Sequence, residues 1–142
     1  MKKIISSLRA LAIALGMVLA CGHVQAQSLQ SRTGSYLGKI ERAGSVYDRS
    51  GSYQGKINSD GTMYDRTGSY LGKFSSDGSV YDRSGSYRGK VNSDGSVYDR
   101  TGSYMGKINS DGSVYDRTGS YRGKAENVKR HHAAAYFFFE FF

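Results

Sequence analysis

A repeat of 17 residues constrains the fold of this chain more than any other feature. The hexapeptide Gly-Ser/Thr-Val/Met-Tyr-Asp-Arg occurs five times at this interval, beginning at Gly44, Gly61, Gly78, Gly95 and Gly112. A second motif, Tyr-X-Gly-Lys, occurs six times, beginning at Tyr36, Tyr53, Tyr70, Tyr87, Tyr104 and Tyr121. A fixed period predicts copies of one supersecondary unit, and each copy buries its apolar face against its neighbours.

Each half of the repeat is predicted to be a short β-strand. Tyr, Val, Ile and Phe favour a pleated, half-buried surface, and each run is bounded by turn residues. The segment Asn58-Ser59-Asp60-Gly61 and its copies contain Asp-Gly, a strong hairpin signal. The other connection, Asp48-Arg49-Ser50-Gly51, has Asp at the start of a turn and Gly where a positive φ is needed. Two strands and two tight turns therefore alternate along the array.

The register of these hairpins has two solutions. If Asp60-Gly61 forms a two-residue turn, Ile57 faces Tyr64. If Ser59-Asp60-Gly61 forms a three-residue loop that ends in a bulged glycine, Ile57 faces Met63 instead. Both registers pair apolar side chains, so the pattern leaves the register open, and with it the question of which tyrosine points inward.

The array is expected to close into a ring. An open meander of eleven short strands would leave two unpaired edges, whereas near-identical copies impose the same rotation at each step. The half-copy at Tyr36–Ile40 has no preceding partner and is expected to close the ring by meeting the last copy, as in propellers. The expected fold is all-β: a closed ring of five tandem hairpin repeats with propeller-like pseudo-symmetry.

The repeated pattern from Gly55 to Gly72 resembles that of the five-fold β-flower proteins, a family of small exported bacterial proteins. The resemblance covers about residues 30 to 124, and the aromatic C-terminus is also similar to theirs. It implies five hairpin petals around an axis. It implies no activity.

The first 26 residues are predicted to be a signal peptide. Lys2, Lys3 and Arg9 precede an apolar run, Ala10 to Cys21, that is too short to span a bilayer. Cleavage after Ala26 is favoured, which places the protein in the periplasm or at the cell surface. The alternative is lipoprotein processing before Cys21, which would lipidate that cysteine. Without this leader the chain has 17 basic and 12 acidic residues, a net charge of +5.

Residues 125–142 form the predicted tail, which is helical at first and aromatic at its end. Ala125 to Ala135 has good helix propensity. The aromatic side chains are Tyr136, Phe137, Phe138, Phe139, Phe141 and Phe142. Such a segment needs a partner: it either plugs the open face of the ring or contacts a membrane interface or a partner groove. An outer-membrane targeting signal ending in Phe142 is a further alternative.

No catalytic or metal site is predicted. Nucleophilic catalysis needs a base beside the nucleophile, and the histidines, His23, His131 and His132, lie only in the leader and the tail. The Asp residues of the Asp-Gly turns lack the closely spaced oxygen ligands that calcium needs. No enzyme activity and no cofactor are therefore expected.

Repeated charges form two expected rings. One consists of Lys39, Lys56, Lys73, Lys90, Lys107 and Lys124. The other consists of Arg49, Arg66, Arg83, Arg100 and Arg117. These charges either pair with the aspartates of the Tyr-Asp-Arg motifs or offer a multivalent surface to a repeating anionic ligand.

We therefore expect a non-catalytic, exported structural or binding module, built from a repeat domain at 27–124. Its candidate ligand is an anionic glycan or another envelope component that contacts the lysine ring, with tyrosines stacking on sugar rings. The alternative function is a membrane-associated interaction protein, anchored by the aromatic tail or by a lipid on Cys21. Nucleic acid is not an expected partner, because an exported protein rarely meets it.

Overall fold

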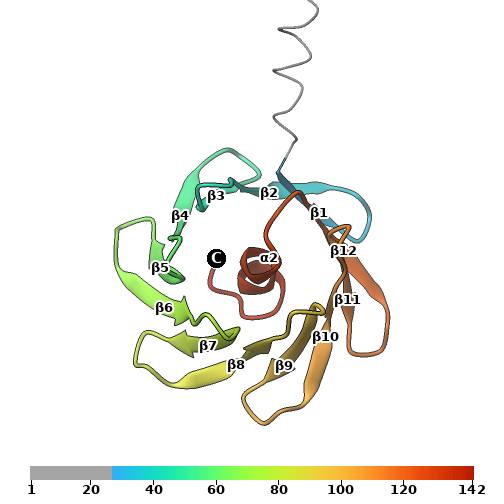
Figure 1. Cartoon of the computed structure of the whole chain (residues 1–142). Coiled ribbons are helices and arrows are strands. Elements are labelled where there is room, and N and C mark those ends of the chain that lie inside the picture. The colour runs from blue at the N-terminus through green and yellow to red at the C-terminus, as the bar shows by residue number, and fades with distance from the viewer. Residues whose placement is uncertain (1–26) are drawn as a thin grey trace, which may run out of the picture.

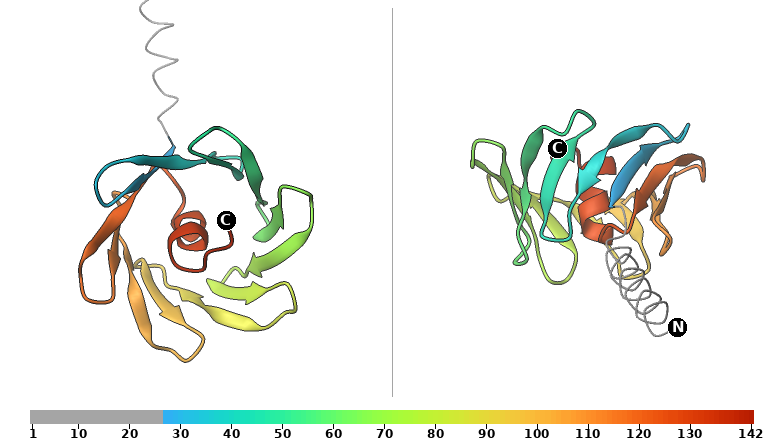
Figure 2. Two further views of the ribbon diagram at one scale, coloured as in Figure 1. Left: turned by 180° about the vertical axis from the view of Figure 1, so that it is seen from behind. Right: turned by 90° about the horizontal axis from the view of Figure 1, so that it is seen from above.

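The computed structural model describes residues 27–142, in which twelve antiparallel strands close into a barrel. The first strand of each hairpin is β1 (Ser28–Ser31), β3 (Ser45–Asp48), β5 (Thr62–Asp65), β7 (Ser79–Asp82), β9 (Ser96–Asp99) or β11 (Ser113–Asp116). The second is β2 (Tyr36–Ile40), β4 (Tyr53–Ile57), β6 (Tyr70–Phe74), β8 (Tyr87–Val91), β10 (Tyr104–Ile108) or β12 (Tyr121–Glu126). The six hairpins surround a single described helix, α2 (Arg130–Phe137), which lies inside the ring (Figures 1 and 2). The predicted closed all-β ring is confirmed.

The strand that closes the ring is β1, which the repeat pattern did not reveal. Leu29 of β1 pairs with Ala125 of β12, and β2 lies between β1 and β3. The expectation that Tyr36–Ile40 itself meets the last copy is therefore wrong. Leu29 occupies the place that Val46 has in the next hairpin, but Gln30 and Ser31 replace the Tyr-Asp of the other copies. The ring thus contains one hairpin more than the five copies that the sequence shows.

The connection that contains Asp-Gly is a three-residue loop. Ile57 pairs with Met63, and the backbone amide of Asn58 donates a hydrogen bond to the backbone oxygen of Thr62 at 2.8 Å. Gly61 has a φ of +90°. This is the second of the two predicted registers, with a type I turn followed by a glycine bulge. The oxygen of Gly61 then accepts a hydrogen bond from the amide of Phe74 at 2.9 Å. Each loop therefore also pairs with the next hairpin along the ring.

The barrel interior is lined by two apolar residues from each hairpin. The first strands supply Leu29, Val46, Met63, Val80, Val97 and Val114, and the second strands supply Ile40, Ile57, Phe74, Val91, Ile108 and Ala125. All of these side chains are buried. Neither tyrosine of a repeat points into this core, because both lie on the outer face with the lysines.

The centre of the barrel is filled by the C-terminal tail. Ala133, Ala134 and Ala135 of α2 are completely buried, and their small side chains allow a helix to fit inside the ring. Ala125 and Glu126, predicted to begin the tail, belong instead to β12, because they pair with β1. The helix therefore begins only at Arg130.

Five phenyl rings of the tail lie against five different hairpins. Each ring approaches a strand glycine so closely that a Cβ atom on that glycine would lie within 3.2 Å of the ring's Cε1 atom. The pairs are Phe137 with Gly123, Phe138 with Gly106, Phe139 with Gly89, Phe141 with Gly72 and Phe142 with Gly55. The tail is therefore bound to most of the circumference of the ring.

The strand glycines are expected to be intolerant of a side chain. A Cβ atom on Gly72 would overlap the backbone oxygen of Tyr81 and lie 3.1 Å from Cε1 of Phe141. Gly72→Ala is therefore expected to lower the free energy of unfolding by at least about 2 kcal/mol, measured by urea denaturation. Gly68→Ala is the control. Gly68 has a φ of +84° and open space around it, so only backbone strain of about 1 kcal/mol is expected. Equal losses for the two variants would contradict this account.

Candidate functional site

The barrel assembles the six predicted lysines on its outer face. In each second strand the lysine lies between a buried glycine and a buried apolar residue, as Lys56 lies between Gly55 and Ile57, so its side chain points away from the core. The residues are Lys39, Lys56, Lys73, Lys90, Lys107 and Lys124. Lys56 faces Tyr64 on one neighbouring strand and Ser45 on the other. The predicted lysine ring is thus present as a set of equivalent positions around the barrel.

Pairs of tyrosine rings accompany the lysines. Tyr64 and Tyr70 face each other across β5 and β6, with ring centroids 5.7 Å apart and an interplanar angle of 67°. The same edge-to-face arrangement, at 5.7 to 5.8 Å, occurs in Tyr47–Tyr53, Tyr81–Tyr87, Tyr98–Tyr104 and Tyr115–Tyr121. The second tyrosine of each pair is exposed, by 36 to 41%. The hairpin β1–β2 lacks the pair, because Gln30 faces Tyr36.

We call this outer surface the Lys–Tyr belt: the six lysines together with the five tyrosine pairs. Lys39 shows how its members interact, because its Nζ lies 4.9 Å from the centroid of the Tyr47 ring. A cation near an aromatic face is attracted by the ring quadrupole. The belt therefore presents alternating positive charge and exposed aromatic edges.

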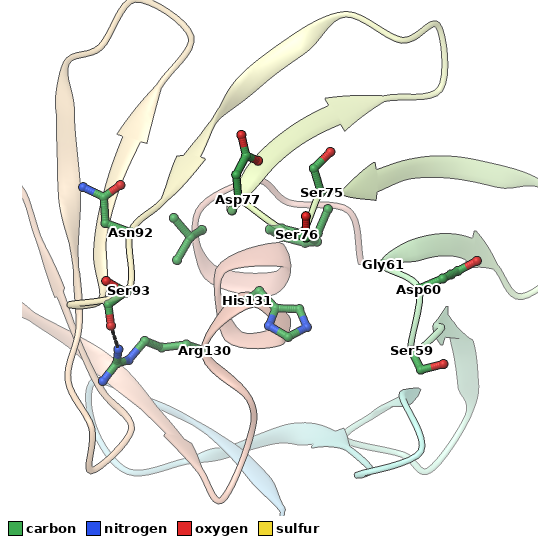
Figure 3. A pocket seen from close by; sticks show the side chains of 13 residues that line it. Ser59, Asp60, Gly61, Ser75, Ser76, Asp77, Asn92, Ser93, Arg130 and His131 are labelled. Carbon is green, nitrogen blue, oxygen red and sulfur yellow. Dashed lines mark hydrogen bonds between the residues drawn. The ribbon is translucent and has the colours of Figure 1, made fainter.

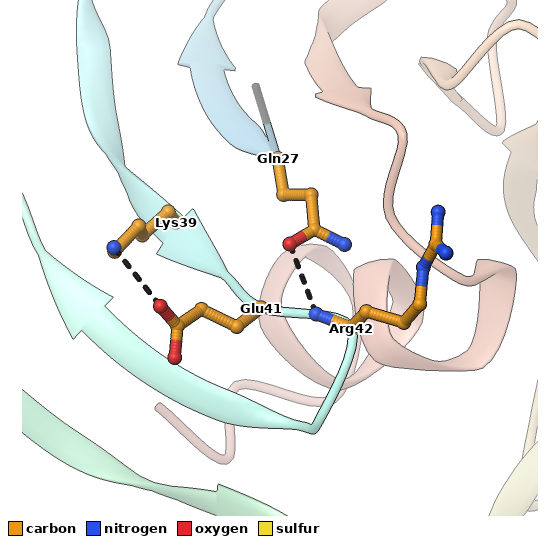
Figure 4. A network of polar contacts seen from close by, with 4 residues as sticks. All are labelled: Gln27, Lys39, Glu41 and Arg42. Carbon is orange, nitrogen blue, oxygen red and sulfur yellow. Dashed lines mark hydrogen bonds and ion pairs between the residues drawn. The ribbon is translucent and has the colours of Figure 1, made fainter. Parts of the chain in front are cut away.

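Among the described residues, most lysines of the belt form no close ion pair. Within residues 27–142 the ion pairs are Lys39–Glu41 at 3.1 Å (Figure 4) and Lys124–Glu126 at 3.9 Å. The hydrogen bond from Lys39 to Glu41 raises the pKa of that lysine. The four remaining lysines, Lys56, Lys73, Lys90 and Lys107, make no such pair in this part of the chain. Lys73, Lys90 and Lys107 nevertheless lie near enough to Asp60, Asp77 and Asp94 to interact with them electrostatically.

The aspartates of the Tyr-Asp-Arg motifs stabilise turns instead of pairing with arginines. Oδ1 of Asp65 accepts hydrogen bonds from the amide of Thr67 at 2.8 Å, the hydroxyl of Thr67 at 2.6 Å and the amide of Ser69 at 3.0 Å. These bonds, the Thr67 hydroxyl first, lower the pKa of Asp65. The expectation that these aspartates pair with the ring of arginines is therefore wrong, because the turn uses the carboxylate. Arg66 is exposed at the loop tip.

The aspartates of the Asp-Gly loops are turn residues, as predicted. Oδ1 of Asp60 accepts hydrogen bonds from the amide of Thr62 at 3.0 Å and from its hydroxyl at 2.6 Å. In the described part of the chain, no group of three or more His, Cys, Asp or Glu side chains could hold a metal ion.

The predicted membrane-contact residues lie in the tail that fills the barrel. Phe137, Phe138 and Phe139 are at most 7% exposed, whereas Tyr136, Phe141 and Phe142 are partly buried against the same core. The tail therefore plugs the ring, and Phe137, Phe138 and Phe139 could meet a membrane only if the tail left the barrel. No helix among residues 27–142 is long and apolar enough to cross a membrane. Cys21, the candidate for lipidation, lies outside the described residues, as does the whole leader.

Two adjacent histidines, His131 and His132, lie in the first turn of α2. The ring centroids of His131 and His132 are 4.5 Å apart, and His132 is only 3% exposed. Burial, followed by the charges of His131 and Lys129, lowers the pKa of His132 to about 3. Burial also lowers the pKa of His131. Both imidazoles are therefore neutral at pH 7.

The family model described as 5-fold beta-flower protein matches residues 26–142 of this chain. The match covers the whole barrel and the tail. No curated protein and no solved structure matches the chain.

The neutral His132 is expected to make stability depend on pH. Its pKa is about 6.5 when unfolded and about 3 when folded, so the unfolded chain binds the proton first as the pH falls below 6.5. Between pH 7 and pH 5 this should remove about 2 kcal/mol of the free energy of unfolding.

Urea denaturation at several pH values measures this loss. The variant His132→Phe keeps an aromatic ring at this position but cannot be protonated, so its stability should change less between pH 7 and pH 5. The turn aspartates do not interfere in this window, because their pKa values are lowered from 3.8. An unchanged slope in the variant would show that His132 is not the titrating group.

Proposed function

This chain belongs to the family of 5-fold β-flower proteins, a small repeat fold, and we propose that it is an exported, non-catalytic binding module. Its ligand is an anionic glycan of the cell envelope, and the Lys–Tyr belt is the surface that binds it. The single observation that carries this proposal is the fivefold repetition of a lysine beside an edge-to-face tyrosine pair.

The chemistry of the belt suits a polymer with regularly spaced charges. Lys56, Lys73, Lys90 and Lys107 form no close ion pair among the described residues. Lys73, Lys90 and Lys107 interact electrostatically with Asp60, Asp77 and Asp94, and a ligand's sulfate, phosphate or carboxylate group would compete only with this weaker attraction. Exposed tyrosines such as Tyr70 provide flat apolar surfaces and hydroxyl groups beside these charges. Weak contacts at equivalent positions add up when one polymer engages several of them at once.

Export is part of the same proposal. It rests on the basic and apolar leader at 1–26, with cleavage after Ala26 as the favoured processing. Cleavage there would leave the barrel intact, because β1 begins at Ser28, and Gln27 would remain to accept a hydrogen bond from the amide of Arg42 at 3.0 Å. The intact mass of the protein recovered from a bacterial periplasm is expected to match that of a chain that begins at Gln27. A lipidated Cys21 would instead support the membrane-associated alternative.

Binding to immobilised anionic polysaccharides, measured at low and high salt, tests the ligand. The wild-type chain should bind sulfated, uronic-acid or phosphorylated polymers, bind neutral polymers weakly, and lose binding at high salt because salt screens exposed charges. The triple variant Lys56→Gln, Lys73→Gln, Lys90→Gln should bind about tenfold more weakly, since each exposed charge pair contributes about 0.5 kcal/mol.

A matched control removes the same charge elsewhere. The triple variant Arg66→Gln, Arg83→Gln, Arg100→Gln changes loop-tip arginines outside the belt and should retain most of the binding. Equal loss in both triple variants would show that net charge, not the belt, attracts the polymer. Absence of any salt-sensitive binding would refute the glycan proposal, and tail-dependent binding to anionic vesicles would favour the membrane alternative.

A further inference from the structure

A cavity of about 510 Å³ lies at the mouth of the barrel, between the first turn of α2 and three consecutive Asp-Gly loops (Figure 3). Phe74 and Ser75 line it at the place where the other Asp-Gly loops follow Ile or Val and then Asn. The side chains of Asp60, Asp77 and Asn92 point away from this cavity (Figure 3). Their polar groups are therefore directed toward the outer surface, where the lysines of the Lys–Tyr belt lie.

A second cavity, of about 350 Å³, lies beside Lys90 of the belt. Asp77 lines it from the loop that precedes β7, and Asn92, Ser93 and Asp94 line it from the loop that follows β8. Lys90 therefore shares one cavity with an aspartate from each of two consecutive Asp-Gly loops. A cation and two carboxylates are thus offered to the same stretch of a ligand.

Each of these aspartates uses one carboxylate oxygen to hold its loop. Oδ1 of Asp77 accepts a hydrogen bond from the amide of Ser79 at 2.9 Å, and Oδ1 of Asp94 accepts one from the amide of Ser96 at 2.9 Å. Hydrogen bonds from Ser79, followed by the charge of Lys90, lower the pKa of Asp77, so this carboxyl group is ionised at pH 7. The second oxygen of each carboxylate can accept a hydrogen bond from a ligand's hydroxyl group.

The alternation of charge repeats around the ring, because most lysines of the belt have a loop aspartate near enough to interact with electrostatically. The pairs are Lys73 with Asp60, Lys90 with Asp77, Lys107 with Asp94 and Lys124 with Asp111. The belt is therefore not a uniformly positive surface. A polymer with closely spaced anionic groups would place some of them beside these carboxylates, which repel them.

The register of the strands sets the distance between successive lysines. Lys56 faces Tyr64 on one side of β5, whereas Lys73 faces Thr62 on the other side. Two strand spacings and a shift of two residues along the strand place their Cα atoms about 12 Å apart. This distance exceeds the Debye length of about 8 Å at physiological ionic strength, so each lysine attracts an anionic group of its own. One disaccharide unit of an extended polysaccharide has a comparable length.

We propose that the Lys–Tyr belt selects polysaccharides in which one anionic group per disaccharide alternates with a neutral sugar unit. This inference rests on the proposed function and names the class of polymer that the belt recognises. Each anionic group meets a lysine such as Lys90. The neutral unit presents its hydroxyl groups to the second oxygens of Asp77 and Asp94 and to the side-chain amide of Asn92.

Two polymers of different charge density test this selectivity. Hyaluronate has one carboxylate per disaccharide, whereas heparin has several sulfate and carboxylate groups per disaccharide. Affinities of the wild-type chain for oligosaccharides of equal length are measured at physiological ionic strength, and hyaluronate should bind at least as tightly as heparin. Tighter binding of heparin would overturn this inference and leave the anionic-glycan proposal standing, whereas binding of neither polymer would overturn both.

Removing the loop aspartates should shift the preference toward heparin. In the triple variant Asp60→Asn, Asp77→Asn, Asp94→Asn, each side chain keeps an Oδ1 atom to accept the hydrogen bonds of its loop, so the fold should be retained. The variant should bind heparin about tenfold more tightly than the wild type, because repulsion at three positions is removed. Its affinity for hyaluronate should change much less, since neutral sugar units face these positions.

A matched control removes the same charge from turns outside the belt. The triple variant Asp82→Asn, Asp99→Asn, Asp116→Asn also preserves the Oδ1 acceptors of its turns and should keep the wild-type preference. Thermal unfolding verifies that both triple variants are folded. An equal gain in heparin affinity in both would show that net charge, not the loop aspartates, sets the selectivity, and would overturn the inference.

Discussion

The closeness of each second strand to its neighbour and to the tail is the constraint on which the rest of the structure depends. Gly72 and its equivalents lie so near the next strand's carbonyl oxygen that no side chain fits, and at five of these six glycines a phenyl ring of the tail takes the space that a side chain would occupy. A barrel of twelve strands would otherwise enclose more room than its own short apolar side chains fill. The strand glycines therefore leave the space that the phenyl rings of the tail fill, and the barrel needs both to be packed.

The turns and the closed ring could be predicted because the residues that determine them are local and repeated. Asp60-Gly61 specifies a hairpin wherever it occurs, but choosing between the two registers needed the hydrogen bond that Gly61 makes to the neighbouring hairpin. Ser28–Ser31 could not be recognised, since only Leu29 preserves the pattern and its pairing with β12 spans the whole chain. The position of the tail likewise depends on the inner width of the ring, which only closure determines.

The Lys–Tyr belt could be predicted from the sequence, whereas the cavity beside α2 could not. Lysines at an interval of 17 residues are visible in the sequence, and their common outward direction follows from the alternation of a strand. The cavity depends on which strands α2 packs against, and the sequence around Arg130 and His131 does not indicate this. A signal was nevertheless present: Phe74 and Ser75 break the repeat together. In a chain of near-identical units, departures from the pattern distinguish one position of the ring from the others.

The pairing of β1 with β12 joins the first described strand to the last, and the plug follows β12 in the chain. Until the final residues are present, every partial array has an open edge and an unfilled centre. Assembly therefore requires the complete array and the tail, so a chain that is still being synthesised cannot reach its stable form early. A truncated product would be left with unpaired strand edges, the kind of surface that aggregates.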